Sequence, residues 1–226
     1  VVVFENHAYS QVIGSSSAPY LNSLKAGGAN LTQSYGITHP SQPNYFALFS
    51  GSTQGVTDDS CYTPGFSSAP NLASELIAAG RSWASYNETL PSQGSTTCSS
   101  GKYARKHNPW FGFGNVPTST AKTFAQFPTD YSTLPKMSFV VPNLCSDMHD
   151  CSVSTGDTWL QNNLAPTRPG PRPTTACSSS PSTRTTASAA TGSPRSCTAS
   201  RSRPVRRPPP PTTITTCCAP WRTPRG

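Results

Sequence analysis

Residues 167–226 lack the residue types from which a folded core is built. This stretch contains no Leu, Phe, Met or Tyr and no Lys, Asp or Glu, whereas it holds ten Arg and twelve of the chain's 24 Pro. A segment of this composition buries too little apolar surface to offset the entropy that is lost on ordering. We therefore predict a globular domain at residues 1–166, followed by a disordered low-complexity tail at residues 167–226.

Charge is divided unevenly between these two parts. The 226-residue chain carries a net charge of +8, but residues 1–166 hold only seven Lys and Arg against nine Asp and Glu. The basic tail leaves open a protein that binds nucleic acid or an anionic membrane. Trp221 is the only aromatic residue of the tail, so the tail offers little base stacking and we expect no nucleic-acid partner.

Long hydrophobic runs are also absent. No apolar stretch approaches the ~20 residues that a membrane span requires, so we expect no stable membrane insertion. Val1 opens directly into a strand-like run, and we expect the natural N-terminus to precede it. We expect a monomer.

Four of the eight cysteines lie in the predicted domain, at Cys61, Cys98, Cys145 and Cys151. No pair has the two-residue spacing of a zinc knuckle. An even number of Cys in a domain with few charges favours disulfides and a secreted, extracellular location. We predict Cys145–Cys151 as a local clip and Cys61–Cys98 as the remaining pair. The alternative is that the four are buried free thiols in a cytosolic protein.

Apolar strands alternate with helical patterns, which predicts an α/β fold with a central, mostly parallel sheet flanked by helices. Strands are expected at residues 1–4, 31–37, 82–86 and 137–142. Helices are expected at residues 18–27, 45–50, 71–79 and 157–164, the last with Asp157 in its first turn.

Polar residues directly follow the first predicted strand, at Glu5, Asn6 and His7. In open α/β sheets, ligand and catalytic sites form at this carboxyl edge. Carboxylate and amide oxygens suit a hard divalent cation, whereas a zinc site would more often contain His or Cys.

The sharpest local motif runs from Thr38 to Tyr45 and places Ser41 just before a helix with Pro43 in its first turn. Unpaired N–H groups and the positive end of the helix dipole favour an alkoxide and a bound phosphate there. A base or metal is needed to activate a serine hydroxyl. The alternative is that Ser41 is an ordinary N-cap.

Two further motifs each set a histidine among polar residues, at Lys106-His107-Asn108-Pro109 and Asp147-Met148-His149-Asp150. Either imidazole could position a phosphate oxygen or protonate a leaving group. Each could instead be a surface or capping residue. Because all four His lie in polar motifs and none lies in an apolar stretch, the pattern favours a site.

Five motifs in this order resemble the secreted phosphoesterases, a family in the alkaline-phosphatase-like superfamily that includes acid phosphatases, phosphatidylinositol-phosphate phosphatases and bacterial phospholipases C. They are Val1–His7, His39–Gly51, Lys106–Pro109, Val141–Cys151 and Gly156–Leu160. The resemblance implies a central sheet flanked by helices, and it implies that residues 1–166 are the incomplete N-terminal part of the domain.

The resemblance also implies roles for individual residues. Glu5 and Asn6 match the family's first pair of metal ligands, and Ser41 matches the nucleophile. His107 and His149 match phosphate-contacting histidines, and we assign phosphate binding also to the neighbouring motif residues His39, Asn44 and Asn108.

The implied activity is metal-dependent hydrolysis of phosphate esters through a phosphoseryl intermediate, with a divalent cation as cofactor. The implied partner is a phosphorylated small molecule or a phosphoinositide or phospholipid headgroup. We expect a phosphomonoesterase. The alternatives are a phospholipase C-type phosphodiesterase and a non-catalytic secreted protein, whose basic tail binds polyanions or whose His and Asn motifs serve only as turns.

The tail does not resemble the family, whose members continue with an apolar strand, an acidic metal-binding cluster and a histidine. An alternative reading frame restores these features. In this frame, each true codon begins on the last base of the preceding visible codon. The codons of Cys177–Ala187 can then encode Leu-Leu-Val-Val-Thr-Phe-Asp-Glu-Asn-Asp-Gly. Those of Thr212–Pro224 can encode a segment with a histidine and an amphipathic helix. We hypothesise a frameshift near Pro166, and we expect the chain as written to bind metal weakly and to be inactive.

Overall fold

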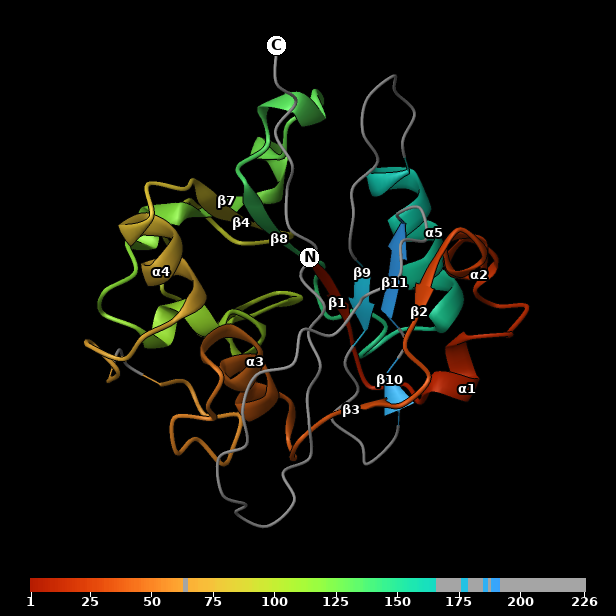
Figure 1. Cartoon of the computed structure of the whole chain (residues 1–226), viewed down its shortest axis with the longest axis horizontal. Helices are drawn as coiled ribbons and strands as arrows, with labels where there is room; N and C mark the ends of the chain where they lie inside the picture. Colours follow the sequence, from red (N-terminus) through yellow and green to blue (C-terminus); the bar gives the residue numbers. More distant parts are fainter. Residues whose placement is uncertain (63–64, 166–175, 179–184, 187, 192–226) are drawn as a thin grey trace, which may run out of the picture. The chain divides into compact units, whose positions relative to one another are not determined.

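The computed structural model describes residues 1–62, 65–165, 176–178, 185–186 and 188–191 (Figure 1). Most of the predicted tail, including the alternative reading of Thr212–Pro224, therefore lies outside the described residues. The strands are β1 (Val2–Phe4), β2 (Gly28–Asn30), β3 (Ser34–Tyr35), β4 (Trp83–Asn87), β5 (Ser99–Ser100), β6 (Tyr103–Ala104), β7 (Ala121–Thr123), β8 (Met137–Val141), β9 (Ala176–Ser178), β10 (Thr185–Thr186) and β11 (Ser188–Thr191). The α-helices are α1 (Tyr9–Val12), α2 (Pro19–Ala26), α3 (Ser41–Ser50), α4 (Leu72–Ala78) and α5 (Val153–Leu164).

A mostly parallel sheet forms the centre of the described residues, in the order β2-β11-β9-β1-β8-β4-β7. Strands β1, β8, β4 and β7 pair in parallel, and β9 extends the parallel part beside β1. Strand β11 is antiparallel to both β9 and β2. The predicted α/β class is confirmed.

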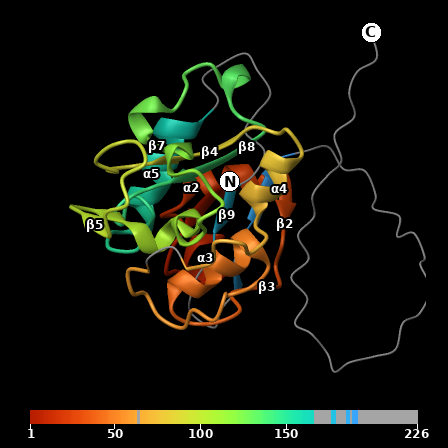
Figure 2. The ribbon, with the colours of Figure 1, turned by 90° about the vertical axis from the view of Figure 1, so that its left-hand side faces the viewer.

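Helices cover both faces of this sheet. Neighbouring residues of a strand point to opposite faces, and both faces carry apolar residues that must be buried. On β8, Phe139 packs into one apolar core and Val140 into another. The first core receives Phe49 from α3 and Ala73 from α4, and the second receives Leu21 from α2 together with residues of α5. Figure 2 views the molecule from the side of α3 and α4.

Besides α3, which is described with the site, two predicted elements differ from the structure. The strand expected at residues 31–37 is replaced by the short strands β2 and β3, and Leu31, Tyr35 and Ile37 stay exposed. Helix α5 begins at Val153, four residues before Asp157, because the Ser152 side chain accepts a hydrogen bond from the Thr155 N–H and caps the helix earlier.

Both predicted disulfides are present, Cys61–Cys98 and Cys145–Cys151. The second closes a loop that follows β8 and contains Asp147 and His149. The first joins the segment after α3 to the segment that leads into Lys106 and His107. No helix of the described residues is long and apolar enough to cross a membrane.

Candidate active site

Glu5 lies at the carboxyl end of β1 and is buried, with 1% of its surface exposed. Asn6 follows with a φ of 60°, a left-handed conformation that Asn adopts more readily than most residues, and turns the chain out of the sheet. Burial raises the pKa of the Glu5 carboxyl, and the nearby His107 imidazole opposes part of that rise. The Oε1 atom of Glu5 makes no hydrogen bond within the described part of the chain.

Ser41 is the first residue of α3, and its hydroxyl donates a hydrogen bond to Oε2 of Glu5 at 3.0 Å. The helix begins earlier than the predicted residue 45, and its N-cap is Pro40. The alternative in which Ser41 is the N-cap is therefore wrong, because the hydroxyl points at a carboxylate instead of a backbone N–H. A buried hydroxyl at a helix N-terminus is placed where the dipole stabilises an alkoxide.

A short segment after α3 covers the N-terminus of that helix. The backbone N–H of Gln42 donates to Oδ1 of Asp59 at 2.9 Å. The Gln42 side-chain amide donates to the carbonyl oxygens of Asp58 and Ser60, at 3.0 and 2.8 Å. The first turn of the helix that carries Ser41 is thus fixed by residues 58–60.

His107 is buried between two carboxylates. Its Nδ1 lies 3.1 Å from Oδ2 of Asp147, and its Nε2 lies 3.9 Å from Oε1 of Glu5. Tyr45, one turn after Ser41, stacks on the imidazole at 4.9 Å between ring centroids. Burial disfavours the imidazolium, but Glu5 and Asp147 outweigh that effect and raise the pKa of His107.

Asp147 touches three other site residues. Besides contacting the His107 ring, its Oδ1 accepts the backbone N–H of His149 at 2.8 Å. Its carbonyl oxygen accepts the N–H of Glu5 at 2.7 Å. This one residue therefore connects the end of β1, the segment of His107 and the loop after β8.

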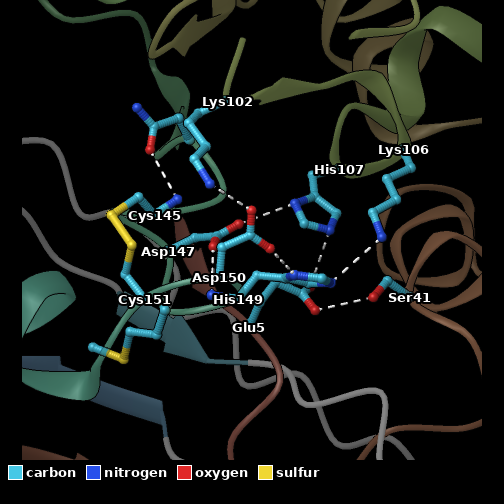
Figure 3. A network of polar contacts seen from close by, with 12 residues as sticks. Glu5, Ser41, Lys102, Lys106, His107, Cys145, Asp147, His149, Asp150 and Cys151 are labelled. Atoms are coloured by element: carbon cyan, nitrogen blue, oxygen red, sulfur yellow. Dashed lines mark hydrogen bonds and ion pairs between the residues drawn. A yellow bond between two sulfur atoms is a disulfide. The ribbon is translucent and has the colours of Figure 1, made fainter.

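His149 lies on the more open side of the site, with its ring centroid 5.8 Å from that of His107 (Figure 3). Its Nδ1 is 2.8 Å from Oδ1 of Asp150, and Lys102 pairs with the other oxygen of Asp150 at 2.9 Å. Its Nε2 faces the Lys106 ammonium at 3.5 Å, and the same ammonium pairs with Oδ2 of Asp59 at 2.9 Å.

The other predicted site residues lie outside this network. His39 is exposed. The Asn44 side chain accepts from the N–H groups of Ile37 and Thr38 and donates to the Thr38 and Pro40 carbonyls, so it fixes the turn before α3. Asn108 is buried and donates to the Ala104 carbonyl. A phosphate-binding role for these residues stays a prediction.

Sequence reasoning assigned no role to Tyr45, Asp59, Lys106 or Asp147. Tyr45 stands four residues after Ser41, which is the spacing of one helix face. Lys106 and Asp147 lie inside motifs already chosen for their histidines. No sequence motif marked Asp59 as a site residue, because its partners Gln42 and Lys106 are distant in sequence.

The chemistry of these residues fits a divalent cation. Carboxylates outnumber lysines in the network: Glu5, Asp59, Asp147 and Asp150 stand against Lys102 and Lys106. Even with His107 as the imidazolium, four carboxylates exceed three cations, so a phosphate dianion would meet an excess of negative charge unless a further cation were bound. Within the described residues, Oε1 of Glu5 is also a buried oxygen without a hydrogen bond. The described residues hold no group of three or more His, Cys, Asp and Glu placed to bind a metal, so Glu5 and the Ser41 oxygen would supply part of a ligand set.

Comparison with known proteins matches residues 3–176 to the profile of the Phosphoesterase family. A phosphatidylinositol-3-phosphatase of Mycobacterium tuberculosis is 50% identical over 167 residues, which cover 73% of this chain and 56% of that protein. A probable acid phosphatase of Kluyveromyces lactis is 32% identical, with 74% of this chain and 42% of that protein covered. A phosphate-repressible acid phosphatase of Penicillium chrysogenum is 34% identical, with 65% and 38% covered. The chain thus spans about half the length, or less, of these curated relatives.

Proposed function

Because this chain belongs to the phosphoesterase family, we propose that it hydrolyses phosphate monoesters with Ser41 as the nucleophile and a divalent cation held in part by Glu5. The observation that carries the proposal is the hydrogen bond from the Ser41 hydroxyl to the buried Glu5 carboxylate at the start of α3. Few structural roles require a serine hydroxyl to meet a buried carboxylate at the edge of a sheet.

The reaction proceeds in two displacements. The Ser41 Oγ attacks phosphorus while its proton passes to a base, and the ester oxygen leaves as the alcohol after protonation. Water then attacks the phosphoserine, which releases inorganic phosphate and restores the serine. A bound divalent cation supplies positive charge that lowers the pKa of the hydroxyl and stabilises the negative charge of the transferred phosphoryl group.

The chain's own residues orient these groups. Glu5 holds the hydroxyl, and the N-terminus of α3 stabilises its oxygen as charge develops. His107 is held by Asp147 and Tyr45, and its raised pKa favours the imidazolium, which can contact an anionic phosphate oxygen. His149 is the more exposed of the two histidines, at 24% against 2%, and is the one that can reach a leaving alcohol to protonate it.

We further propose a phosphoinositide headgroup as a natural substrate and secretion as the natural location. The first rests on the similarity to a phosphatidylinositol-3-phosphatase, and the second on two disulfides, which persist in oxidising compartments.

The test is release of phosphate from p-nitrophenyl phosphate and from a soluble phosphatidylinositol 3-phosphate. The chain is assayed as written and with the reading frame restored after Pro166, with divalent cation and with chelator. We expect Ser41→Ala to lower kcat by about 1,000-fold or more, and Glu5→Gln to raise the cation concentration required. Ser50→Ala, at the other end of α3, is the matched control and should retain full activity.

Undiminished activity of Ser41→Ala would refute the assignment of the nucleophile. Faster hydrolysis of bis-p-nitrophenyl phosphate than of the monoester would favour the phospholipase C-type alternative.

A further inference from the structure

Lys106 is a cation of the site that the reaction outlined above does not use. It precedes His107 in a short 3-10 helix, Arg105–His107, and its side chain is 22% exposed. Its ammonium is held by Asp59 and faces Nε2 of His149. A lysine that serves only solubility extends its ammonium into water, whereas most of the Lys106 side chain is buried against Asp59 and His149.

A chain of contacts connects the Lys106 ammonium to the Ser41 hydroxyl in both directions. From Ser41 they run to Glu5 at 3.0 Å, from Glu5 to His107 at 3.9 Å, and from the His107 ring to that of His149 at 5.8 Å. From His149 they run to Lys106 at 3.5 Å, from Lys106 to Asp59 at 2.9 Å, and from Asp59 to the backbone of Gln42, the neighbour of Ser41. The contacts form a closed ring, and Figure 3 shows the part of it in which Lys106 is directed toward His149 and Ser41 toward Glu5.

The contacts of Lys106 leave it able to bind a further group. An ammonium has three N–H donors. Within the described residues, Asp59 accepts one and His149 faces a second, so one donor remains for a ligand. Because Asp59 also holds the first turn of α3, the ammonium is fixed relative to Ser41.

We propose that Lys106 contacts the anionic oxygens of the substrate phosphate and favours dianionic monoesters over monoanionic diesters. The proposal rests on the proposed function and deepens it, because it names the charge state that the site selects. A fixed cation interacts about twice as strongly with a dianion as with a monoanion at the same distance. Asp59 is then a positioning residue, which holds the ammonium without touching substrate.

Lys102 provides a matched control. It lies four residues earlier on the same segment and also pairs with an aspartate of the network, Asp150, at 2.9 Å. Its side chain is 52% exposed, and it takes no part in the ring of contacts.

The first test compares kcat/KM for p-nitrophenyl phosphate and for methyl p-nitrophenyl phosphate in the full chain with its reading frame restored. Lys106→Met is expected to lower the monoester value by about 100-fold and the diester value by about tenfold, since the interaction with the monoanion is about half as strong. Lys106→Arg keeps the charge and should preserve the preference for the monoester. Equal losses on the two esters, or a loss no larger than that of Lys102→Met, would overturn the proposal.

The second test needs neither a variant nor turnover. The full-length wild-type chain, with a divalent cation present, is acetylated with and without inorganic phosphate, and the modification of each lysine is followed by mass spectrometry. Phosphate should slow acetylation of Lys106 at least severalfold and leave Lys102 unchanged; equal rates at Lys106 would overturn the assignment. If the chain with its reading frame restored hydrolyses no ester, the proposed function fails, and protection of Lys106 alone decides whether it contacts phosphate.

Discussion

At the scale of single residues, the site depends on carboxylates that hold histidines. Asp147 contacts the His107 ring and the His149 backbone, and Asp150 contacts Nδ1 of His149. Holding one ring nitrogen fixes where the other points: Nε2 of His107 faces Glu5, and Nε2 of His149 faces Lys106. Substitution of Asp147 should therefore disturb both histidines, although the residue itself need not touch substrate.

The raised pKa of His107 makes stability depend on pH. Because the folded state binds this proton more tightly than the unfolded state, the stabilisation is complete below the ordinary pKa of about 6.5 and is lost as pH rises through the raised value. We expect the urea midpoint of the metal-free chain to fall as pH increases above about 6.5, and His107→Gln to flatten that slope. The exposed His39 supplies the control variant, His39→Gln, and the same slope in both variants would contradict the prediction.

At the scale of elements, α2 and α5 are joined by an interaction that helix patterns do not reveal. Asp157 does not stabilise the first turn of its own helix as predicted. Its carboxylate instead accepts the N–H groups of Tyr20 and Leu21, at 3.0 and 2.7 Å, and caps the N-terminus of α2. The carboxylate is 2% exposed, so the two charge-assisted hydrogen bonds are shielded from water.

We expect Asp157→Asn to lower the free energy of unfolding by about 2 kcal/mol, because a buried charged acceptor for two backbone donors is lost. Urea denaturation measures the change. Glu75→Gln on the exposed face of α4 is the matched control and should change stability by less than about 0.5 kcal/mol. Equal effects of the two substitutions would show that the interaction contributes little.

At the scale of the whole molecule, strand β9 lies where the alternative reading frame encodes an apolar strand. Ala176–Ser178 pairs in parallel with β1, the strand that ends at Glu5. The alternative frame permits Leu-Leu-Val from Cys177 and then an acidic cluster. Carboxylates that follow such a strand would emerge at the same edge as Glu5, where the proposed cation would need further ligands.

Restoring the reading frame after Pro166 should therefore stabilise the chain and increase its affinity for divalent cations. At saturating cation we expect Tm to rise by about 5–10 °C above that of the chain as written, because ligand binding shifts the equilibrium toward the folded state. Scanning calorimetry with and without chelator measures the shift. Independent sequencing of the gene that reproduces the written frame without interruption would instead contradict the frameshift.

Local residue patterns were enough to predict most of the central strands and helices and the general place of the site. Strands β1, β4 and β8 and helices α2, α4 and α5 follow from apolar runs and helical spacing, and both disulfides follow from the number and spacing of four cysteines. These are local patterns, set by which side chains a strand or helix must bury. The site was located in the same way, from polar residues at the end of a buried strand.

Which side chains meet depends on the three-dimensional fold. Ser41 and Glu5 are 36 residues apart, Lys106 and Asp59 are 47 apart, and Asp157 reaches Tyr20 across 137 residues. No periodicity connects such positions, because their contacts depend on how strands pair and helices cross. Burial then shifts the pKa of groups such as Glu5 and His107. For the same reason no helix pattern indicates that Asp157, which lies in α5 as expected, caps α2, and the partners of His107 and Lys106 emerge only from the fold.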